Sequence, residues 1–170
     1  ALLFTIGFPL AGFLRALMLV VWVLPAVVAA SLWRWMYSGS HGVINAALGW
    51  FGIQTDHAWL IDPRTALPAV IVANIWLGIP FHMLLLYAGL QGIPRELYEA
   101  TTIDGASRPQ QFWHITVPLL LPVILTTLLL GFVHTFKAFD IVYVMTSGGP
   151  AGATAVLPIT VYQKSFEFFQ

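Results

Sequence analysis

Two long apolar runs, residues 66–93 and 117–136, restrict the fold of this chain more than any other feature of its sequence. Neither run contains Asp, Glu, Lys or Arg, and each provides the about 20 residues that a helix needs to cross the roughly 30 Å hydrocarbon core of a bilayer. In the whole chain 8% of residues are charged and 59% are hydrophobic, whereas soluble domains contain roughly 25% charged residues. The sequence therefore predicts an all-α membrane protein.

Residues 16–36 form a third run of spanning length, interrupted by Pro25. A membrane helix tolerates such a proline as a kink, because neighbouring helices satisfy the freed carbonyl. Trp33 and Trp35, near the end of this run, are expected to anchor the helix at the membrane interface. The segments 37–65 and 140–170 are rich in turn residues and are expected to lie outside the membrane. Because the chain opens within an apolar run without a charged leader, it is interpreted as a fragment with about three complete spans.

The charged stretch between the two long runs carries the signals of two short helices. Five of the fourteen Asp, Glu, Lys and Arg residues lie here. Pro94 favours the start of the first helix, and Gly105 favours the left-handed conformation that ends one. Ser107 can cap the second helix, with Gln110 completing a capping box, and this helix is expected to end before Pro118. Two short helices joined at a glycine between two spans are typical of a docking surface.

Five residues of this stretch have a specific spacing: Glu-Ala, a Gly six positions after the Glu, and Ile-x-x-Pro starting ten positions after that Gly. These residues are Glu99, Ala100, Gly105, Ile115 and Pro118. They resemble the cytoplasmic signature of the membrane-spanning permease subunits of ATP-binding-cassette importers, most closely in the carbohydrate branch. That signature reads Glu-Ala-Ala, three residues, Gly, nine residues and Ile-x-Leu-Pro. Thr101 and Val117 replace its second Ala and its Leu.

The resemblance implies a polytopic helix bundle of the type I importer permease kind, with residues 1–170 as one permease domain in the cell membrane. It makes residues 94–117 a cytoplasmic ATPase-docking loop and makes 37–65 and 140–170 extracytoplasmic. The docking residues that it implies are Glu99, Ala100, Asp104, Gly105, Ala106, Ile115 and Pro118. The implied partners are a second permease subunit, two cytoplasmic ATPase subunits, an extracytoplasmic solute-binding protein and the lipid bilayer. Judged without the resemblance, the acidic residues of the loop, Glu96, Glu99 and Asp104, are better interpreted as a solvated helix face. Lys and Arg on both sides of the membrane leave the orientation open.

The resemblance also implies a function, the passage of a sugar or a related solute, with coupling through the loop at Glu99–Gly105. Polar side chains inside the spans are candidates for the pathway, because they are costly in lipid and usually face a protein interior. Aromatic side chains can stack on sugar rings. The candidates are Asn74, Trp76, Thr127 and Phe132. The competing interpretations are a bond from the threonine hydroxyl to its own helix and simple packing of the aromatic residues.

Catalytic and metal-binding patterns are absent from the sequence. The chain has no cysteine, and its five histidines lack the i, i+4 pairing of metal sites. Gly148–Pro150 lacks the Gly-Lys-Ser/Thr ending of a phosphate-binding loop. The chain is therefore not expected to be an enzyme or to bind a cofactor, and ATP hydrolysis would belong to a partner subunit. Zero net charge gives no support for nucleic-acid binding. A secondary transporter or channel subunit without an ATPase stays the alternative, although no span carries Asp or Glu at its centre.

Overall fold

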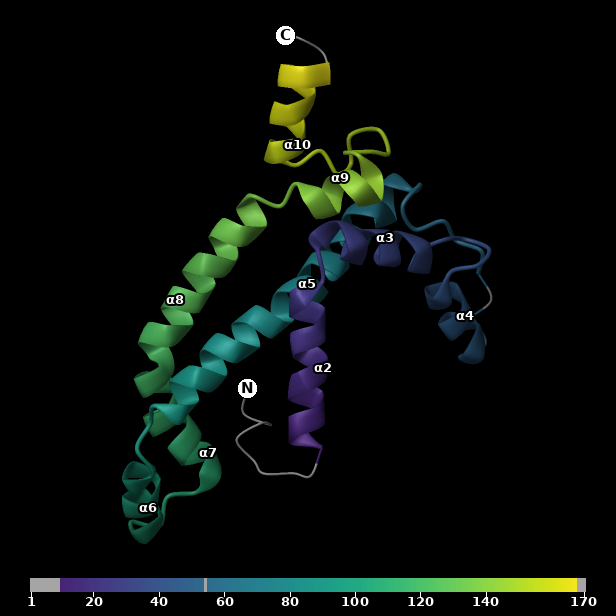
Figure 1. Ribbon diagram of the computed structural model, residues 1–170. Helices are drawn as coiled ribbons and strands as arrows, with labels where there is room; N and C mark the ends of the chain where they lie inside the picture. The colour runs from purple at the N-terminus through teal and green to yellow at the C-terminus, as the bar shows by residue number, and fades with distance from the viewer. Residues whose placement is uncertain (1–9, 54, 168–170) are drawn as a thin grey trace. The chain divides into compact units, whose positions relative to one another are not determined.

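The computed structural model describes residues 10–53 and 55–167, and all regular secondary structure in these ranges is helical. The helices are α2 (Ala11–Val23), α3 (Ala26–Met36), α4 (Val43–Trp50), α5 (Pro63–Gln91), α6 (Arg95–Ile103), α7 (Arg108–Gln111), α8 (Val117–Phe136), α9 (Asp140–Thr146) and α10 (Leu157–Tyr162), with π-helical segments η1 (Phe112–Thr116) and η2 (Gln163–Glu167) (Figure 1). This architecture confirms the predicted all-α fold class.

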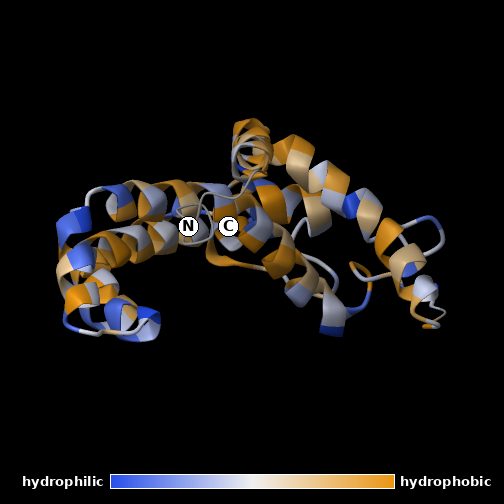
Figure 2. Ribbon diagram, turned by 90° about the horizontal axis from the view of Figure 1, so that it is seen from below, coloured by the Kyte–Doolittle hydropathy of each residue, from blue (hydrophilic) through white to orange (hydrophobic). Residues whose placement is uncertain are grey.

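Two helical segments of the described chain are long and apolar enough to cross a membrane without a break. One is α5, and the other is the helical path 108–136 through α7, η1 and α8; each has 29 residues. Figure 2 shows hydrophobic residues, in orange, recurring along the helices. In the range 16–36, where one kinked span was predicted, the structure has two helices separated at Leu24 and Pro25, which count together only as a broken span. Pro25 donates no N–H and disfavours helical backbone at Leu24, so one helix ends here and the next begins.

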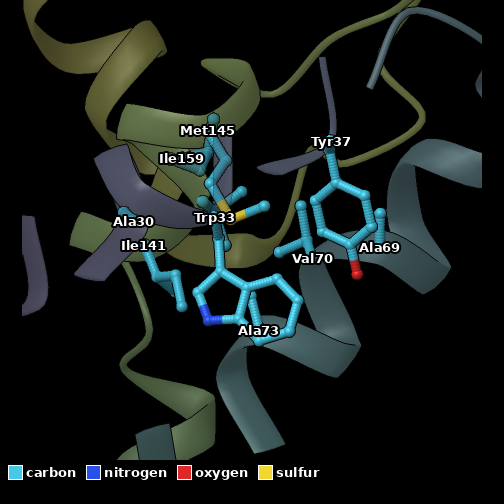
Figure 3. Close-up of a cluster of buried hydrophobic side chains, with 10 residues drawn as sticks. Ala30, Trp33, Tyr37, Ala69, Val70, Ala73, Ile141, Met145 and Ile159 are labelled. Carbon is cyan, nitrogen blue, oxygen red and sulfur yellow. The ribbon is translucent and has the colours of Figure 1, made fainter. Parts of the chain in front are cut away.

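The described chain divides into two compact units, a first unit of residues 10–22 and 78–133 and a second unit of residues 23–53, 55–77 and 134–167. In the second unit, α3 packs against α9 and the N-terminal part of α5 around a cluster of buried side chains (Figure 3). The cluster consists of Ala30, Trp33, Tyr37, Ala69, Val70, Ala73, Ile141, Val142, Met145 and Ile159. Its small alanines let the helix backbones approach closely, as is usual for helices packed in a membrane.

Trp33 lies in this core, so the prediction that it anchors an interface was wrong. Only 9% of the residue is exposed. Its ring centroid lies 5.4 Å from that of Tyr37 and 5.8 Å, edge to face, from that of Trp76. A tryptophan anchors an interface only from a helix face that meets the headgroups. This face of α3 instead meets α5 and α9, where burial of the large ring and the aromatic contacts are favourable.

The turn-rich stretch 147–153 ends α9, as its composition predicts. Ser147 takes a left-handed backbone conformation with φ 53°, directly after the last residue of α9. The Oγ1 of Thr154 donates to the carbonyl of Gly149 at 2.7 Å, and the amide of Gln163 donates to the carbonyl of Ser147 at 3.2 Å. The turn is therefore held by side-chain hydrogen bonds.

In the first unit, α5 and α8 approach each other at two glycines. A Cβ built on Gly89 of α5 would lie 2.9 Å from a methyl of Leu120, and one built on Gly131 of α8 would overlap the imidazole of His82. His82 is held in place by a 2.8 Å bond between its Nδ1 and the carbonyl of Gly78. Glycine at these two positions allows the close helix contact.

Candidate functional site

The first helix of the predicted docking loop, residues 94–117, is α6, and its end follows the sequence pattern. Pro94 precedes the helix and Asp104 closes it. Gly105 comes next with φ 80°, which confirms the predicted left-handed glycine. A Cβ on Gly105 would meet no atom within 4 Å. The backbone conformation, and not a lack of space, is therefore what favours glycine here.

The second helix of the docking loop begins as predicted but does not end as predicted. The Oε1 of Gln110 accepts hydrogen bonds from the backbone N–H and the hydroxyl of Ser107, both 2.8 Å long, in a capping box. The prediction that the helix ends before Pro118 was wrong, because α7 continues through η1 into α8. In η1 the N–H of Val117 bonds the carbonyl of Phe112, five residues earlier. In an α-helix the ring of Pro118 would clash with the carbonyl of the residue four positions earlier, and the wider π-helical turn relieves this clash.

The inner side of the loop forms a pocket of about 350 Å³. It is lined by Thr101, Asp104, Gly105, Ala106, Gln110, Gln111, His114 and Ile115. Four of the seven docking residues inferred from the sequence are among them. The other three, Glu99, Ala100 and Pro118, are exposed outside the pocket lining. Figure 1 shows α6 and α7 lying beside each other at the start of the path into α8.

The outer side of the loop presents charge and apolar surface together. The exposed carboxylate of Glu99 has no ion-pair or hydrogen-bond partner among the described residues. Ile103, at the end of α6, is 87% exposed. A free carboxylate beside an uncovered isoleucine, on a segment between two apolar helices, has the chemistry of a surface that another protein covers.

Two residues that join the helices of the loop were missed by the sequence reasoning. The amide of Gln111 lies within hydrogen-bond distance of three acceptors on α6, and the hydroxyl of Tyr98 bonds the hydroxyl of Thr116. Neither a glutamine within a helix nor a tyrosine near its start gives a local signal of a partner far along the chain. Thr116, the partner of Tyr98, lies in the π-helical segment η1, and a π-helical turn has no signal in the sequence.

The pathway candidates fall in different units. In the second unit, the Nδ2 of half-buried Asn74 lies 3.5 Å from the Oγ1 of Thr135, and Trp76 packs edge to face on Trp33. In the first unit, Phe132 is 69% exposed and Thr127 is 3% exposed. The hydroxyl of Thr127 donates to the carbonyl of Val123, in its own helix, at 2.6 Å. The contacts of Trp76 and Thr127 are those of packing residues. No group of three or more His, Cys, Asp or Glu in the described chain could hold a metal ion.

Residues 1–169 match the model of a family described as the binding-protein-dependent transport system inner membrane component. The chain belongs to this family. Its all-helical fold, its apolar helices of spanning length and its exposed loop between them agree with that membership.

Curated relatives are transport permeases. The trehalose/maltose transport system permease protein MalF of Thermococcus litoralis is 43% identical over 151 residues, which cover 89% of this chain and 51% of that protein. The sulfoquinovosyl glycerol transport system permease protein SmoG of Agrobacterium fabrum is 36% identical over 168 residues, which cover 99% of this chain and 54% of that protein. The chain thus spans about half the length of these relatives.

Solved structures with the same fold belong to a bacterial importer. A chain of an ABC transporter involved in the import of the acidic polysaccharide alginate is similar with a TM-score of 0.87 and 25% identity, over 99% of this chain and 60% of that chain. A chain of the bacterial alginate ABC transporter in complex with a periplasmic protein that holds an alginate pentasaccharide gives a TM-score of 0.82 and 26% identity, over 99% and 59% of the two chains.

Proposed function

We propose that this chain is part of the permease subunit of an ATP-driven importer, a multi-pass protein of the cell inner membrane. The subunit pairs with a second permease subunit and receives solute from an extracytoplasmic binding protein. It docks on the cytoplasmic ATPase subunits, of which the whole importer has two. ATP hydrolysis takes place in the ATPase subunits. Their closure moves the docking loop, and the spans change between two arrangements, as in other two-state switches.

The observation that carries this proposal is the composition of the docking loop. Glu99 and Ile103 offer one free charge and one uncovered apolar side chain on the same short helix. A partner with a basic residue beside an apolar cleft matches both. The loop leads through η1 into a helix of spanning length, so a force on the loop acts directly on the membrane domain.

The proposed solute is a sugar or a related compound. This part of the proposal is supported by the relatives, whose names state transport of trehalose and maltose or of sulfoquinovosyl glycerol, and by the alginate importer of similar fold. The residues proposed to line the pathway are Asn74, Trp76, Thr127 and Phe132. Among them Asn74 and Phe132 have the more accessible side chains.

Replacing Glu99 with Ala is expected to weaken the association of the ATPase by about 10- to 150-fold, because a charge-assisted contact contributes about 1.5–3 kcal/mol. The measurement is copurification of the ATPase subunit with the full-length permease in detergent, titrated for affinity. Membrane insertion is expected to be unchanged, since Glu99 lies outside both long apolar helices.

The matched control is Glu96→Ala, which removes the same charge from the first turn of the same helix. Glu96 is outside the inferred docking set, so this variant is expected to bind the ATPase nearly as well as the parent. If Glu99→Ala and Glu96→Ala behave alike, the charge of Glu99 has no specific partner. If no ATPase copurifies with the parent protein, the importer proposal is refuted and a transporter without an ATPase is favoured.

Replacing Asn74 with Leu is expected to lower solute uptake severalfold while the complex still assembles, because the variant removes the amide that can bond a sugar hydroxyl. The measurement is uptake of radiolabelled maltose by vesicles that contain the complete importer. The Asn74 amide lies near the Oγ1 of Thr135, so Thr135→Val separates the two roles. Equal losses in the two variants would assign Asn74 to bonding within its own unit and remove it from the pathway.

A further inference from the structure

Helix α6 is connected to the spanning helix α8 by two routes. The covalent route runs through Gly105, whose left-handed backbone turns the chain between α6 and α7. The second route is a set of side-chain hydrogen bonds. No residue of α6 is buried, so the packing of buried apolar side chains does not fix the helix, and the hydrogen bonds decide how firmly it is attached.

The amide of Gln111, the last residue of α7, is at the centre of these bonds. Its Nε2 lies 2.9 Å from the Oγ1 of Thr102, 3.2 Å from the Oγ1 of Thr101 and 3.2 Å from the carbonyl oxygen of Tyr98. Both threonine hydroxyls donate to backbone carbonyls of α6, which leaves their lone pairs free to accept. An amide nitrogen has two hydrogens, so Gln111 holds two of the three acceptors at a time.

Tyr98 forms the second attachment. Its hydroxyl lies 2.8 Å from the Oγ1 of Thr116, which is the last residue of η1 and is only 4% exposed. The other contact of this buried hydroxyl, with the carbonyl oxygen of Gln111, is 3.5 Å long. The shorter bond to Tyr98 is therefore its main one and is favoured whenever α6 is in place.

The π-helical segment η1 aligns the two attachments. Gln111 and Thr116 are five residues apart, and the Oγ1 of Thr116 lies 3.5 Å from the carbonyl oxygen of Gln111. In a π-helix residues with this separation lie above each other, whereas in an α-helix they do not. The wide turn therefore places both anchors on the face that α6 covers.

We propose that Tyr98, Gln111 and Thr116 are positioning residues that transmit movement of the docking loop to α8. This inference rests on the proposed function, because it assigns the residues a part in coupling to an ATPase. Two attachment points prevent α6 from rotating about the Gly105 linker, so a displacement of α6 is passed to η1 and α8. If the bonds are removed, α6 moves alone and the displacement is lost within the loop.

The test measures the distance between α6 and α8 in the complete importer. Residues 1–170 contain no cysteine. With any cysteines elsewhere in the importer replaced by serine, spin labels are attached at Arg95→Cys on α6 and at Leu128→Cys, a 62% exposed position on α8. Distance distributions are recorded by pulsed electron paramagnetic resonance, without nucleotide and with ATP trapped in a hydrolysis-deficient ATPase. In the parent we expect one narrow distribution that is the same in both states, because α6 and the start of α8 move as one body.

Tyr98→Phe and Thr116→Val each remove one end of the same hydrogen bond. We expect each to increase the fraction of detached α6 by about fivefold, seen as a second, broad component whose weight changes with ATP. The double variant is expected to equal the single variants, and Thr116→Ser is expected to restore the parent distribution. Tyr87→Phe and Thr160→Val are the controls, since Tyr87 lies in α5 under Arg15 and Thr160 bonds only its own helix.

Distributions in Tyr98→Phe and Thr116→Val that stay as narrow as that of the parent would overturn the proposal. It would also be overturned if the two controls broadened the distribution equally, or if these variants lost the ATPase, because the bond would then maintain the docking surface itself. Failure of the proposed function is recognised separately, as an absence of ATPase from the purified parent before any substitution in the network. The nucleotide-free distributions still measure the attachment of α6 in that case.

Discussion

Gly105→Val is expected to abolish transport by the assembled importer while the permease still inserts into the membrane at its normal level. The φ angle of Gly105 is 80°, a region that costs a β-branched residue about 1–3 kcal/mol. The chain can avoid this cost only by changing the turn that sets the direction of α7 relative to α6. Solute uptake and solute-stimulated ATP hydrolysis in reconstituted vesicles, with copurification of the ATPase, are the measurements.

Gly52→Val is a matched control for this prediction. Gly52 also has φ 80°, and a Cβ at either glycine would meet no atom within 4 Å, so the two substitutions impose the same local backbone strain. Gly52 lies outside the docking loop, and its variant is expected to keep ATP hydrolysis coupled to uptake. Equal loss of coupling in the two variants would mean that strain anywhere impairs the protein, and the docking role of Gly105 would be rejected.

Gly105→Ala distinguishes a turn from a contact surface. If Gly105 is needed only for the turn, Gly105→Ala causes less backbone strain than Gly105→Val. The Ala variant then keeps partial transport with normal ATPase binding. If the ATPase approaches the Cα of Gly105 closely, the added methyl impairs binding itself, and Val abolishes it. The open space at this position leaves room for such an approach. Copurification of the ATPase with the two variants decides between these roles.

The parts of the fold that follow from local chemistry were predicted from the sequence. The left-handed Gly105 and the capping box of Ser107 and Gln110 depend on residues within three positions of each other, and both are present. The apolar length of residues 66–93 and 117–136 likewise predicted the long helices α5 and α8. Signals of this kind need no knowledge of what the helices pack against.

The parts that depend on tertiary packing were not predicted. Trp33 was predicted to be an interfacial anchor because it lies near the end of an apolar run. Sequence position alone does not show that its ring packs in the core of the second unit. Pro118 looked like a helix stop because η1 has no sequence signal. At the candidate site, the sequence identified Gly105 and the exposed Glu99, but it did not identify the bonds of Gln111, whose acceptors lie on another helix.

Close helix packing in the first unit makes Gly131 a further position where a single added methyl is expected to lower stability. The Nδ1 of His82 contacts the carbonyl of Gly78 at 2.8 Å, and because a carbonyl can only accept, Nδ1 carries the proton and donates. The ring is therefore fixed, with its Nε2 edge against the position that a Cβ on Gly131 would occupy. The imidazole can yield to a methyl at Gly131 only by breaking its own hydrogen bond.

Gly131→Ala is therefore expected to destabilise the permease by about 1–3 kcal/mol, the usual cost of overpacking a tight core. The measurement is thermal unfolding of the detergent-solubilised full-length protein. Gly78→Ala is the matched control, since its added methyl would lie 3.8 Å from the same imidazole, an ordinary contact. This control is expected to be neutral or slightly stabilising, because Ala has a higher helix propensity than Gly. Combining Gly131→Ala with His82→Ala removes the obstacle, so the double variant is expected to be no less stable than His82→Ala alone. A Gly131→Ala protein with the unfolding temperature of the parent would contradict the close contact of α5 and α8 at this point.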